Sequence, residues 1–340
     1  MNDSIFSFRN EKGKIKVDIA TELLSKEFRE QMKVIDLVYE TKYFIGMHDN
    51  MKNLKPKRER TCRFCGKSYP EVTFKKDAHI VPELIGNKKL LSDFECDNCN
   101  WKFGQFENDL ANFLGPFRTF ANLAGKNGIP KYKSADKELT IELAPDSVFD
   151  VRMKDFSYIE NNIKFERKDK ILKIQSKSNP YTPLNVFKSL LKSAVSFVDK
   201  GDLKYLSDTF KFLMDDDFEI DSSANFIITI HQYFIPGEIK SSPFIIYYRK
   251  QENLKNYPAP SMAFVFYIKN TVIQLFVPFH SDDYFFYKPE QEKERKIFVI
   301  PPLIPEKWIN QNGVPFSRIE HLNDKNRLKD VIQNIWIKYN

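Results

Sequence analysis

The four cysteines of the chain form two pairs of identical spacing. The pairs are Cys62-Arg-Phe-Cys65 and Cys96-Asp-Asn-Cys99, and the 340-residue sequence contains no other cysteine. A two-residue gap lets a tight turn aim both sulfurs at one centre, and zinc prefers sets of four thiolates. Two disulfides or four buried thiols are the alternatives, but a cytosolic chain seldom keeps disulfides. The spacing therefore predicts one structural zinc ion bound by all four cysteines.

The residues between and after the two pairs carry a second pattern. His79-Ile-Val-Pro82 lies between the pairs, and Asn100 follows the second pair directly. In this combination the sequence resembles the HNH, or ββα-metal, endonuclease family, in the variant with two zinc-binding Cys-x-x-Cys pairs. The resemblance implies a treble-clef-like ββα-metal module in which His79 is the general base. It also implies that Asn100 binds a catalytic divalent ion.

The chemistry of phosphodiester hydrolysis explains why such residues are needed. The attacking water must lose a proton near neutral pH, and the pKa of histidine suits that task. A hard cation, Mg²⁺ or Mn²⁺, neutralises charge on the scissile phosphate and stabilises the departing oxygen. An amide or carboxylate oxygen is a suitable ligand for that ion. The zinc, closed by four sulfurs, has only a structural role.

The chain departs from the family pattern at two positions. Ala78 stands where the family usually has a second metal ligand, and Leu91 stands near the place of a middle asparagine that braces the loop. Asp77 lies two residues before His79, on the same face of an extended strand, and is our substitute ligand. Asn87 is a candidate for the bracing role. These departures leave open a catalytically inactive, zinc-stapled nucleic-acid-binding protein.

An amphipathic helix is expected after Cys99, because its apolar residues recur at helical spacing. The apolar stripe consists of Phe103, Phe106, Leu110, Phe113 and Phe117. Asn100, Gly104, Glu107 and Ala111 follow a different line, where the small residues would let another segment approach closely. Glu107 is therefore a further catalytic candidate, although a solvated carboxylate is the simpler interpretation. Trp101 is expected in the core rather than as a base-stacking platform, and is assigned no functional role.

Composition limits the class of protein. Hydrophobic residues make up 42% of the chain and aromatic residues 14%, which is enough for packed cores. No apolar run approaches the roughly 20 residues that span a bilayer. The N-terminal sequence lacks the basic region and apolar core of a signal peptide. With reduced thiolates, these features predict a cytoplasmic protein that does not contact membranes.

We expect three segments along the chain. Residues 1–56 have helical character, with an amphipathic helix over 21–43 that is a candidate for homodimerisation. Residues 57–125 form the HNH-like module. A basic run over 52–76 enters this module and suits a phosphate backbone, although a solvated linker is the alternative. Residues 126–340 form a C-terminal α+β domain for regulation or target selection.

The C-terminal domain is expected to have a mainly antiparallel sheet, because β-branched and aromatic residues cluster in short runs. Thr182-Pro183 marks a helix start, and Lys269-Asn270 suits a tight hairpin. His231 is expected to be a hydrogen-bonded core residue, and His280 with Asp282 and Asp283 a polar turn rather than a cation site. The expected strands are 139–143, 148–151, 163–165, 171–174, 226–230, 244–248, 263–268, 272–277 and 297–300, and the expected helices are 184–198 and 203–214.

These features predict a metal-dependent endonuclease that hydrolyses DNA, with double-stranded DNA as its partner. Chains that join an HNH module to an unrelated domain resemble restriction or anti-phage nucleases, which suggests antiviral defence by analogy. The C-terminal domain would receive an activating ligand or partner protein. The alternatives are the inactive nucleic-acid-binding protein and, less favoured, a protein-interaction module.

Overall fold

A computed structural model describes most of the chain. The described residues are 6–11, 14–19, 37–46, 54–145, 148–168, 171–220, 227–234, 243–255, 257, 259–269, 271–284 and 317–338. The chain forms two compact units, which we describe separately. The sheet unit comprises Met1–Asp49, Leu191–Gln311 and Pro315–His321, and the cysteine unit comprises Asn50–Leu190, Asn312–Val314 and Leu322–Asn340.

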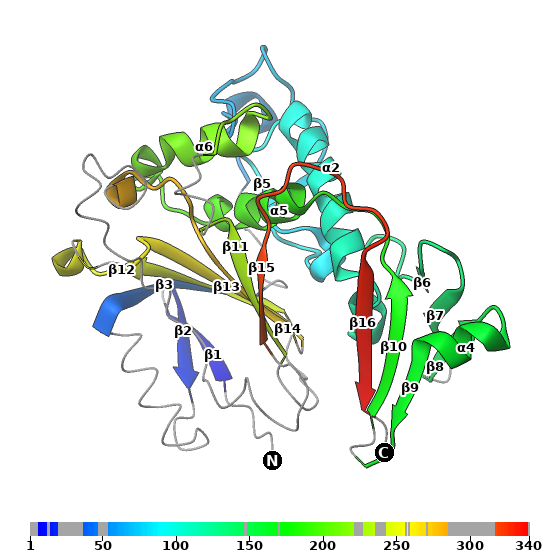
Figure 1. The fold of residues 1–340 in the computed structure, drawn as a ribbon. Helices are drawn as coiled ribbons and strands as arrows, with labels where there is room; N and C mark the ends of the chain where they lie inside the picture. The colour runs from blue at the N-terminus through cyan, green and yellow to red at the C-terminus, as the bar shows by residue number, and fades with distance from the viewer. Residues whose placement is uncertain are drawn as a thin grey trace. The chain divides into compact units, whose positions relative to one another are not determined.

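The sheet unit is built on a six-stranded sheet with the strand order β15-β11-β14-β13-β12-β3 (Figure 1). All five neighbouring pairs in this sheet are antiparallel. Its strands are β3 (Tyr39–Gly46), β11 (Thr229–Phe234), β12 (Phe244–Lys250), β13 (Met262–Ile268), β14 (Thr271–Phe276) and β15 (Ser317–His321). A separate antiparallel hairpin joins β1 (Phe6–Glu11) and β2 (Lys14–Ile19).

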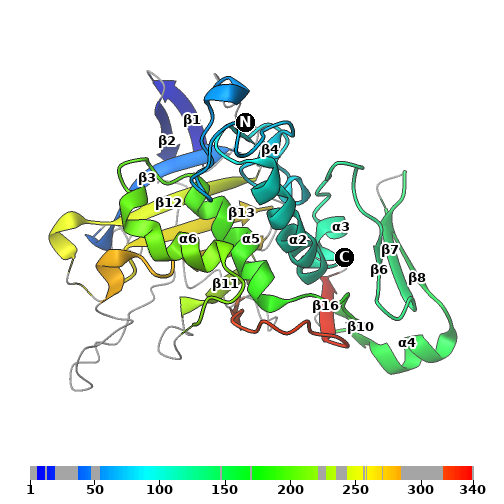
Figure 2. The same cartoon turned by 90° about the horizontal axis from the view of Figure 1, so that it is seen from above.

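The central strands are buried on both faces. Six of the seven residues of β13 and all six of β14 are buried, which explains their continuous apolar sequence. Helix α6 (Ser207–Met214) lies over one face of the sheet (Figure 2). Four residues near the end of α5 (Pro183–Ser196) are also buried in the sheet unit, namely Leu191, Ala194, Val195 and Val198. The described part of this unit also contains the short 3₁₀ helices η4 (Leu203–Leu206), η6 (Glu252–Leu254) and η7 (Ser281–Asp283).

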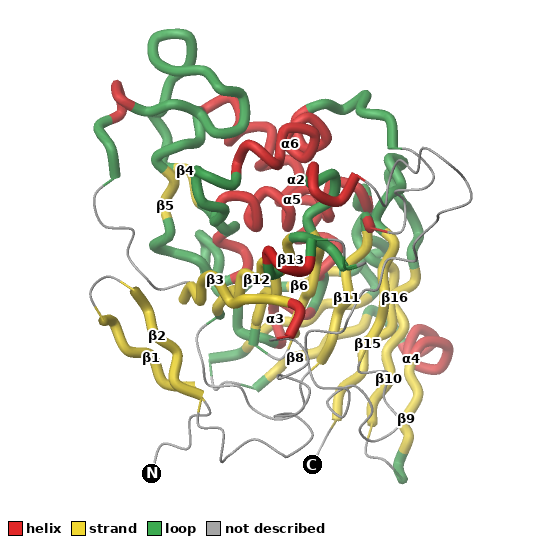
Figure 3. The backbone as a smooth tube through the Cα atoms, turned by 90° about the vertical axis from the view of Figure 1, so that its left-hand side faces the viewer, coloured by secondary structure: helices red, strands yellow, loops and turns green. Residues whose placement is uncertain are grey.

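The cysteine unit combines a loop-rich module with two small antiparallel sheets (Figure 3). The module contains η2 (Lys57–Glu59), β4 (Ala78–His79), η3 (Glu83–Ile85), β5 (Leu91–Ser92) and α2 (Asp97–Leu114). The rest contains α3 (Phe117–Phe120), β6 (Tyr132–Lys133), β7 (Leu139–Leu143), β8 (Phe149–Met153), α4 (Phe156–Asn162), β9 (Ile163–Glu166), β10 (Ile171–Lys177) and β16 (Ile332–Lys338). The sheets have the strand orders β6-β7-β8 and β16-β10-β9, and side chains from both contribute to one core cluster.

Helix α2 is fixed by an apolar stripe and by one buried carboxylate. Phe103, Phe106, Leu110 and Phe113 are buried, as their helical spacing predicts. The buried Asp109 accepts hydrogen bonds from Arg327 Nη1 and Asn185 Nδ2, each at 2.8 Å. The same arginine donates to the carbonyl oxygen of Pro180 at 2.7 Å. These bonds tie α2 to segments far along the chain but within the cysteine unit.

The predicted α+β class with a mainly antiparallel sheet is confirmed. The expected strand 139–143 coincides with β7, and the pairing of Ile268 with Thr271 confirms the hairpin at 269–270, although Asn270 itself is not among the described residues. Expected strand 297–300 also lies outside the described residues. None of the helices in the described part of the chain is long and apolar enough to cross a lipid bilayer.

The prediction of a helical N-terminal segment is wrong for three described stretches, although Leu37 and Val38 are helical as expected. Residues 6–11, 14–19 and 39–46 are strands, and Tyr39 to Tyr43 belongs to the edge strand β3 rather than to a helix. Tertiary pairing of β3 with β12 overrides the local periodicity. Residues 20–36, which carry most of the expected dimerisation helix, lie outside the described residues. The compact units also divide the chain differently from the three predicted segments, whose roles as domains remain predictions.

Candidate metal and nuclease site

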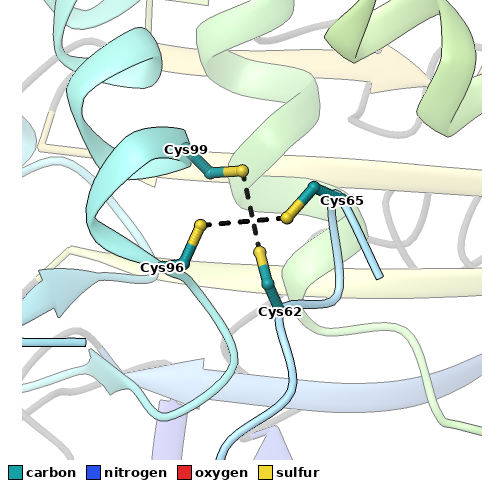
Figure 4. Close-up of side chains that lie close together, drawn as sticks. All are labelled: Cys62, Cys65, Cys96 and Cys99. Atoms are coloured by element: carbon teal, nitrogen blue, oxygen red, sulfur yellow. Dashed lines mark hydrogen bonds between the residues drawn. The ribbon is translucent and has the colours of Figure 1, made fainter. Parts of the chain in front are cut away.

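The four cysteine sulfurs converge on one point (Figure 4). All four Sγ atoms lie within 4.8 Å of one another, with Cys62 and Cys99 separated by 3.7 Å and Cys65 and Cys96 by 3.8 Å. A tetrahedral zinc ion with Zn–S bonds of about 2.3 Å requires sulfurs separated by about 3.8 Å. The donor set therefore fits zinc, and these four cysteines could bind it.

The two pairs come from different local structures. Cys62 and Cys65 lie in a turn in which the backbone N–H of Cys62 donates to Lys67 and that of Gly66 donates to Cys62. Gly66 has a φ of 72°, a left-handed conformation that favours glycine. Cys96 precedes α2, and Cys99 lies in its first turn. A tight turn thus brings one pair to the N-terminus of a helix that carries the other.

The protonation of the thiols reflects their crowding. The hydrogen bond between the Cys62 and Cys99 sulfurs lowers the pKa of Cys62 to about 5 and raises the pKa of Cys99. Burial raises the pKa of Cys96 to about 11. Several thiolates at these distances repel one another, so the fully deprotonated set requires a cation among the sulfurs.

His79 lies at the end of β4 and faces Glu83. Its Nε2 atom is 3.8 Å from Glu83 Oε1, and both side chains are partly exposed. Strand β4 pairs with β5, so that Ala78 lies opposite Ser92 and His79 opposite Leu91. Ala78 is buried, and adjacent strand residues point to opposite faces. A ligand at position 78 would therefore not share the face of His79, whereas Glu83 does contact it.

Asn87 braces the loop that joins β4 to β5. Its fully buried side chain donates from Nδ2 to the carbonyl oxygens of Val81 at 2.7 Å and Leu90 at 3.1 Å. Its Oδ1 accepts from the backbone N–H groups of Lys89 at 3.1 Å and Leu90 at 2.9 Å. These four bonds confirm the bracing role predicted for Asn87, so Leu91 is not needed for it.

The line of Asn100, Gly104 and Glu107 on α2 is half-buried and open at its centre. An added Cβ atom at Gly104 would have no heavy atom within 4 Å, apart from the helix's own backbone and the chain neighbours of Gly104. The expected close approach of another segment at Gly104 is therefore not observed. The expectation that Trp101 lies in the core is wrong, because its side chain is 68% exposed.

Asp97 joins the segment before His79 to the start of α2, a role that sequence reasoning missed. Its carboxylate accepts from the Thr73 hydroxyl and, at 2.9 Å each, from the backbone N–H groups of Lys75 and Lys76. Burial opposes ionisation, but these hydrogen bonds outweigh it and lower the pKa of Asp97. Acidic residues are generally favoured in the first turn of a helix, but this preference does not identify the distant partners of Asp97.

The basic run is mostly exposed, except for Arg60 and Arg63. Arg60 is buried and donates from Nε to the carbonyl oxygen of Lys55 at 2.8 Å, and the Arg63 guanidinium lies 4.1 Å from the centre of the Phe94 ring. Lys52 lies outside the described residues. The exposed members are Lys55, Lys57, Arg58, Lys67, Lys75 and Lys76. They form a solvated positive surface on the module.

The remaining site predictions are not resolved by this geometry. Asp77 is exposed and lies just before β4. Within the described residues, the four cysteines are the only group of three or more His, Cys, Asp and Glu side chains that could hold an ion. Asp77, His79 and Glu107 do not form a second group of this kind. The catalytic ion assigned to Asp77 and Asn100 therefore stays a prediction.

Two histidines of the sheet unit, His231 and His280, have structural surroundings. His231 Nδ1 lies 3.4 Å from the Tyr233 hydroxyl, which confirms its hydrogen bond, and burial lowers its pKa. His280 is buried, accepts from the backbone N–H of Asp282 and stacks on Tyr205 with ring centres 5.4 Å apart. The polar turn predicted at 280–283 is confirmed as η7.

Comparison with known proteins agrees with the geometry of the module. Residues 62–111 match the family model described as HNH endonuclease. The match begins at the first cysteine and ends within α2, so it includes the converging sulfurs, β4, β5 and Asn100. Comparisons with curated proteins and with solved structures find no match to this chain. Residues 62–111 thus form a module that is similar to HNH endonucleases, and this similarity suggests nuclease activity on nucleic acid.

Proposed function

We propose that this protein is a metal-dependent HNH-type endonuclease that hydrolyses phosphodiester bonds of DNA, with duplex DNA as substrate. The observation that carries the proposal is the convergence of four sulfurs at the base of a β4–β5–α2 module that matches this family. Zinc bound by Cys62, Cys65, Cys96 and Cys99 would hold the turn against α2. That ion has no open position for substrate.

In this proposal His79 takes a proton from the attacking water. Glu83, 3.8 Å from His79 Nε2, orients the imidazole and stabilises its protonated form. Asn100 and Asp77 would hold Mg²⁺ or Mn²⁺. Glu107, which lies on the same open side of α2 as Asn100, would reach this ion or orient a bound water. The bound ion supplies charge neutralisation at the scissile phosphate. The exposed lysines attract the nucleic-acid backbone toward the module.

A cytoplasmic location and a role in restriction or anti-phage defence belong to the same proposal. They rest on the reduced cysteines and on the analogy with chains that join an HNH module to a larger second part. The sheet unit would then receive an activating ligand or partner protein. Homodimerisation remains a prediction without support in the described residues.

The second candidate is a zinc-stapled nucleic-acid-binding protein without catalysis. The buried Ala78 favours it, because the position usually occupied by a metal ligand has no ligand atom and faces the interior. This candidate predicts salt-sensitive binding that added Mg²⁺ or Mn²⁺ leaves unchanged.

One experiment separates the two. The full-length protein and its His79→Ala variant are incubated with plasmid, linear DNA and RNA, with and without Mn²⁺ or Mg²⁺. Loss of a general base lowers a rate by about 10²- to 10⁴-fold. His321→Ala is the matched control, since His321 lies in the sheet unit. Zinc content and circular dichroism should stay unchanged in both variants. Equal cleavage by wild type and His79→Ala would rule out the assigned base.

A further inference from the structure

Trp101 is exposed in the first turns of α2, directly after the predicted metal ligand Asn100. Its side chain is 68% exposed, while the apolar stripe of the same helix is buried. Single exposed apolar residues are common and need no function. The surroundings of Trp101 therefore decide whether it has one.

Exposed lysines surround the turn that Trp101 covers. Helical side chains lean toward the N-terminus, so Trp101 lies over the turn that contains Asp97, four residues earlier. The Asp97 carboxylate binds the backbone N–H groups of Lys75 and Lys76, at 2.9 Å each. Lys57 Nζ in turn donates to the carbonyl oxygen of Lys75 at 2.7 Å. We call Lys57, Lys75, Lys76 and Trp101 the aromatic-basic surface.

The charges of this surface favour a polyanion. Its three lysines are exposed, and the Asp97 carboxylate beside them is occupied by three hydrogen bonds. Exposed carboxylates, including Asp77 after Lys76 and Glu59 in η2, also lie in this segment, but the exposed Lys55, Arg58 and Lys67 leave its net charge positive. Lysines alone would bind phosphates of any nucleic acid. An exposed indole adds a flat apolar face that can stack on a base, as in proteins that bind single strands. The combination fits a sugar-phosphate strand whose base is accessible.

We propose that Trp101 stacks on an unpaired base of the nucleic-acid substrate, while Lys57, Lys75 and Lys76 bind the flanking phosphates. This inference rests on the proposed function and specifies its substrate. A base inside a regular duplex is already stacked on both faces, so Trp101 requires a base that is single-stranded or displaced from the helix. The substrate at the site is then a single strand or a locally opened duplex.

Binding is measured separately from cleavage. The His79→Ala protein, without added divalent ions, is titrated with a short single-stranded DNA, the same sequence as RNA, and a blunt duplex. Tryptophan emission reports contact with Trp101, and fluorescence anisotropy reports affinity. The chain also contains Trp308 and Trp336, so Trp101→Phe identifies the signal from Trp101. Phe156→Ala is the matched control, because Phe156 is 70% exposed in α4.

Single strands should quench the emission, and Trp101→Phe should abolish the quenching while keeping most of the affinity. Trp101→Ala should weaken single-strand binding roughly five- to 150-fold, with a smaller change for the duplex. Lys75→Ala and Lys76→Ala should each reduce the slope of log affinity against log salt by about one.

Three results would overturn the proposal. The first is that single strands still quench the emission of Trp101→Phe. The second is that Trp101→Ala and Phe156→Ala change the affinity equally. The third is that Trp101→Ala changes only the self-association of the protein in sedimentation. The last result would assign the surface to a second copy of the chain. Cleavage by protein with His79 intact is assayed in parallel, so the proposed function can stand or fail independently.

Discussion

The cysteine module (residues 62–114) and the sheet unit both contain polar side chains at their centres, but with different surroundings. In the sheet unit the buried Lys250 lies 3.5 Å from the buried Asp283 and donates to the carbonyl oxygen of Ala259 at 2.8 Å. Ser261 donates to the same carboxylate from both its N–H, at 2.8 Å, and its hydroxyl, at 2.6 Å. Such a closed network fixes a core.

The module instead leaves its candidate catalytic residues half-exposed. His79, Asn100 and Glu107 are all partly accessible, and α2 is open at Gly104. Its own core is small and loop-rich, with β4 and β5 of two residues each. Small cores of this kind usually need a metal or disulfides. The comparison teaches that apolar burial holds the sheet unit, whereas the small module would depend on a metal ion bound by its four sulfurs.

Among the substitutions that test this comparison, Cys99→Ser should have the largest effect on stability. Structural zinc contributes about 10–16 kcal/mol in small zinc-binding modules, which equals or exceeds the stability of a whole domain. Zinc content should fall from one ion per chain to none, and amide exchange in residues 62–114 should lose its protection. The central strands β13 and β14 should keep theirs. Retained protection in the module of a zinc-free variant would contradict the role of the sulfurs.

An effect of intermediate size is expected in the pH dependence of stability, through the buried Asp283 and His280 of the sheet unit. Burial raises the pKa of Asp283 to about 6, so the folded state binds this proton more tightly than the unfolded state, and stability falls as pH rises from about 4 to 6. Burial lowers the pKa of His280 to about 4, so its contribution rises with pH from about 4 to 6.5. Each effect amounts to about 3 kcal/mol, with opposite sign.

Single substitutions should expose the two opposing slopes. Relative to wild type, Asp283→Asn should gain stability as pH rises from about 4 to 6. The wild type loses stability over this range as Asp283 gives up its proton, and the asparagine has no proton to give up. His280→Asn, which can still accept the hydrogen bond from Asp282, should lose stability relative to wild type over the same range. Urea unfolding at several pH values measures both differences. If the stability difference from wild type changed with pH in the same direction for both variants, the opposite pKa shifts of Asp283 and His280 would be contradicted.

The sequence predicted several features whose causes lie within a short stretch of chain. The Cys-x-x-Cys pairs converge, because two-residue gaps restrict the geometry, and strands such as β7 follow an alternation of apolar and polar residues. The bracing bonds of Asn87 are also local, because they join it to Val81, Lys89 and Leu90, at most six residues away. These features are local, so one stretch of sequence contains nearly all their causes.

Features that depend on distant partners could not be read in this way. Trp101 is apolar and was expected to be buried, yet the side of α2 that carries it has no cover, and only the fold decides which side is covered. The partners of Asp97 lie more than 20 residues earlier. Strand β3 resembles a helix in periodicity, but pairing with β12, about 200 residues away, makes it a strand. Glu83 was missed because its contact with His79 spans a turn rather than a helix.

The smallest effect sharpens the comparison within the module itself. Asn87→Ala removes four hydrogen bonds and leaves the buried carbonyl oxygen of Val81 without its donor, so the module should lose about 1–3 kcal/mol. Asn87→Asp keeps both acceptor bonds but sets a carboxylate oxygen against two carbonyl oxygens, and should be at least as destabilising. Asn127→Ala, at an exposed position, should change stability by less than about 0.5 kcal/mol. Urea unfolding of zinc-loaded protein measures all three. If Asn87→Ala behaved like Asn127→Ala, the sulfurs alone would hold the loop, because the bracing bonds would then add nothing to the zinc-bound state.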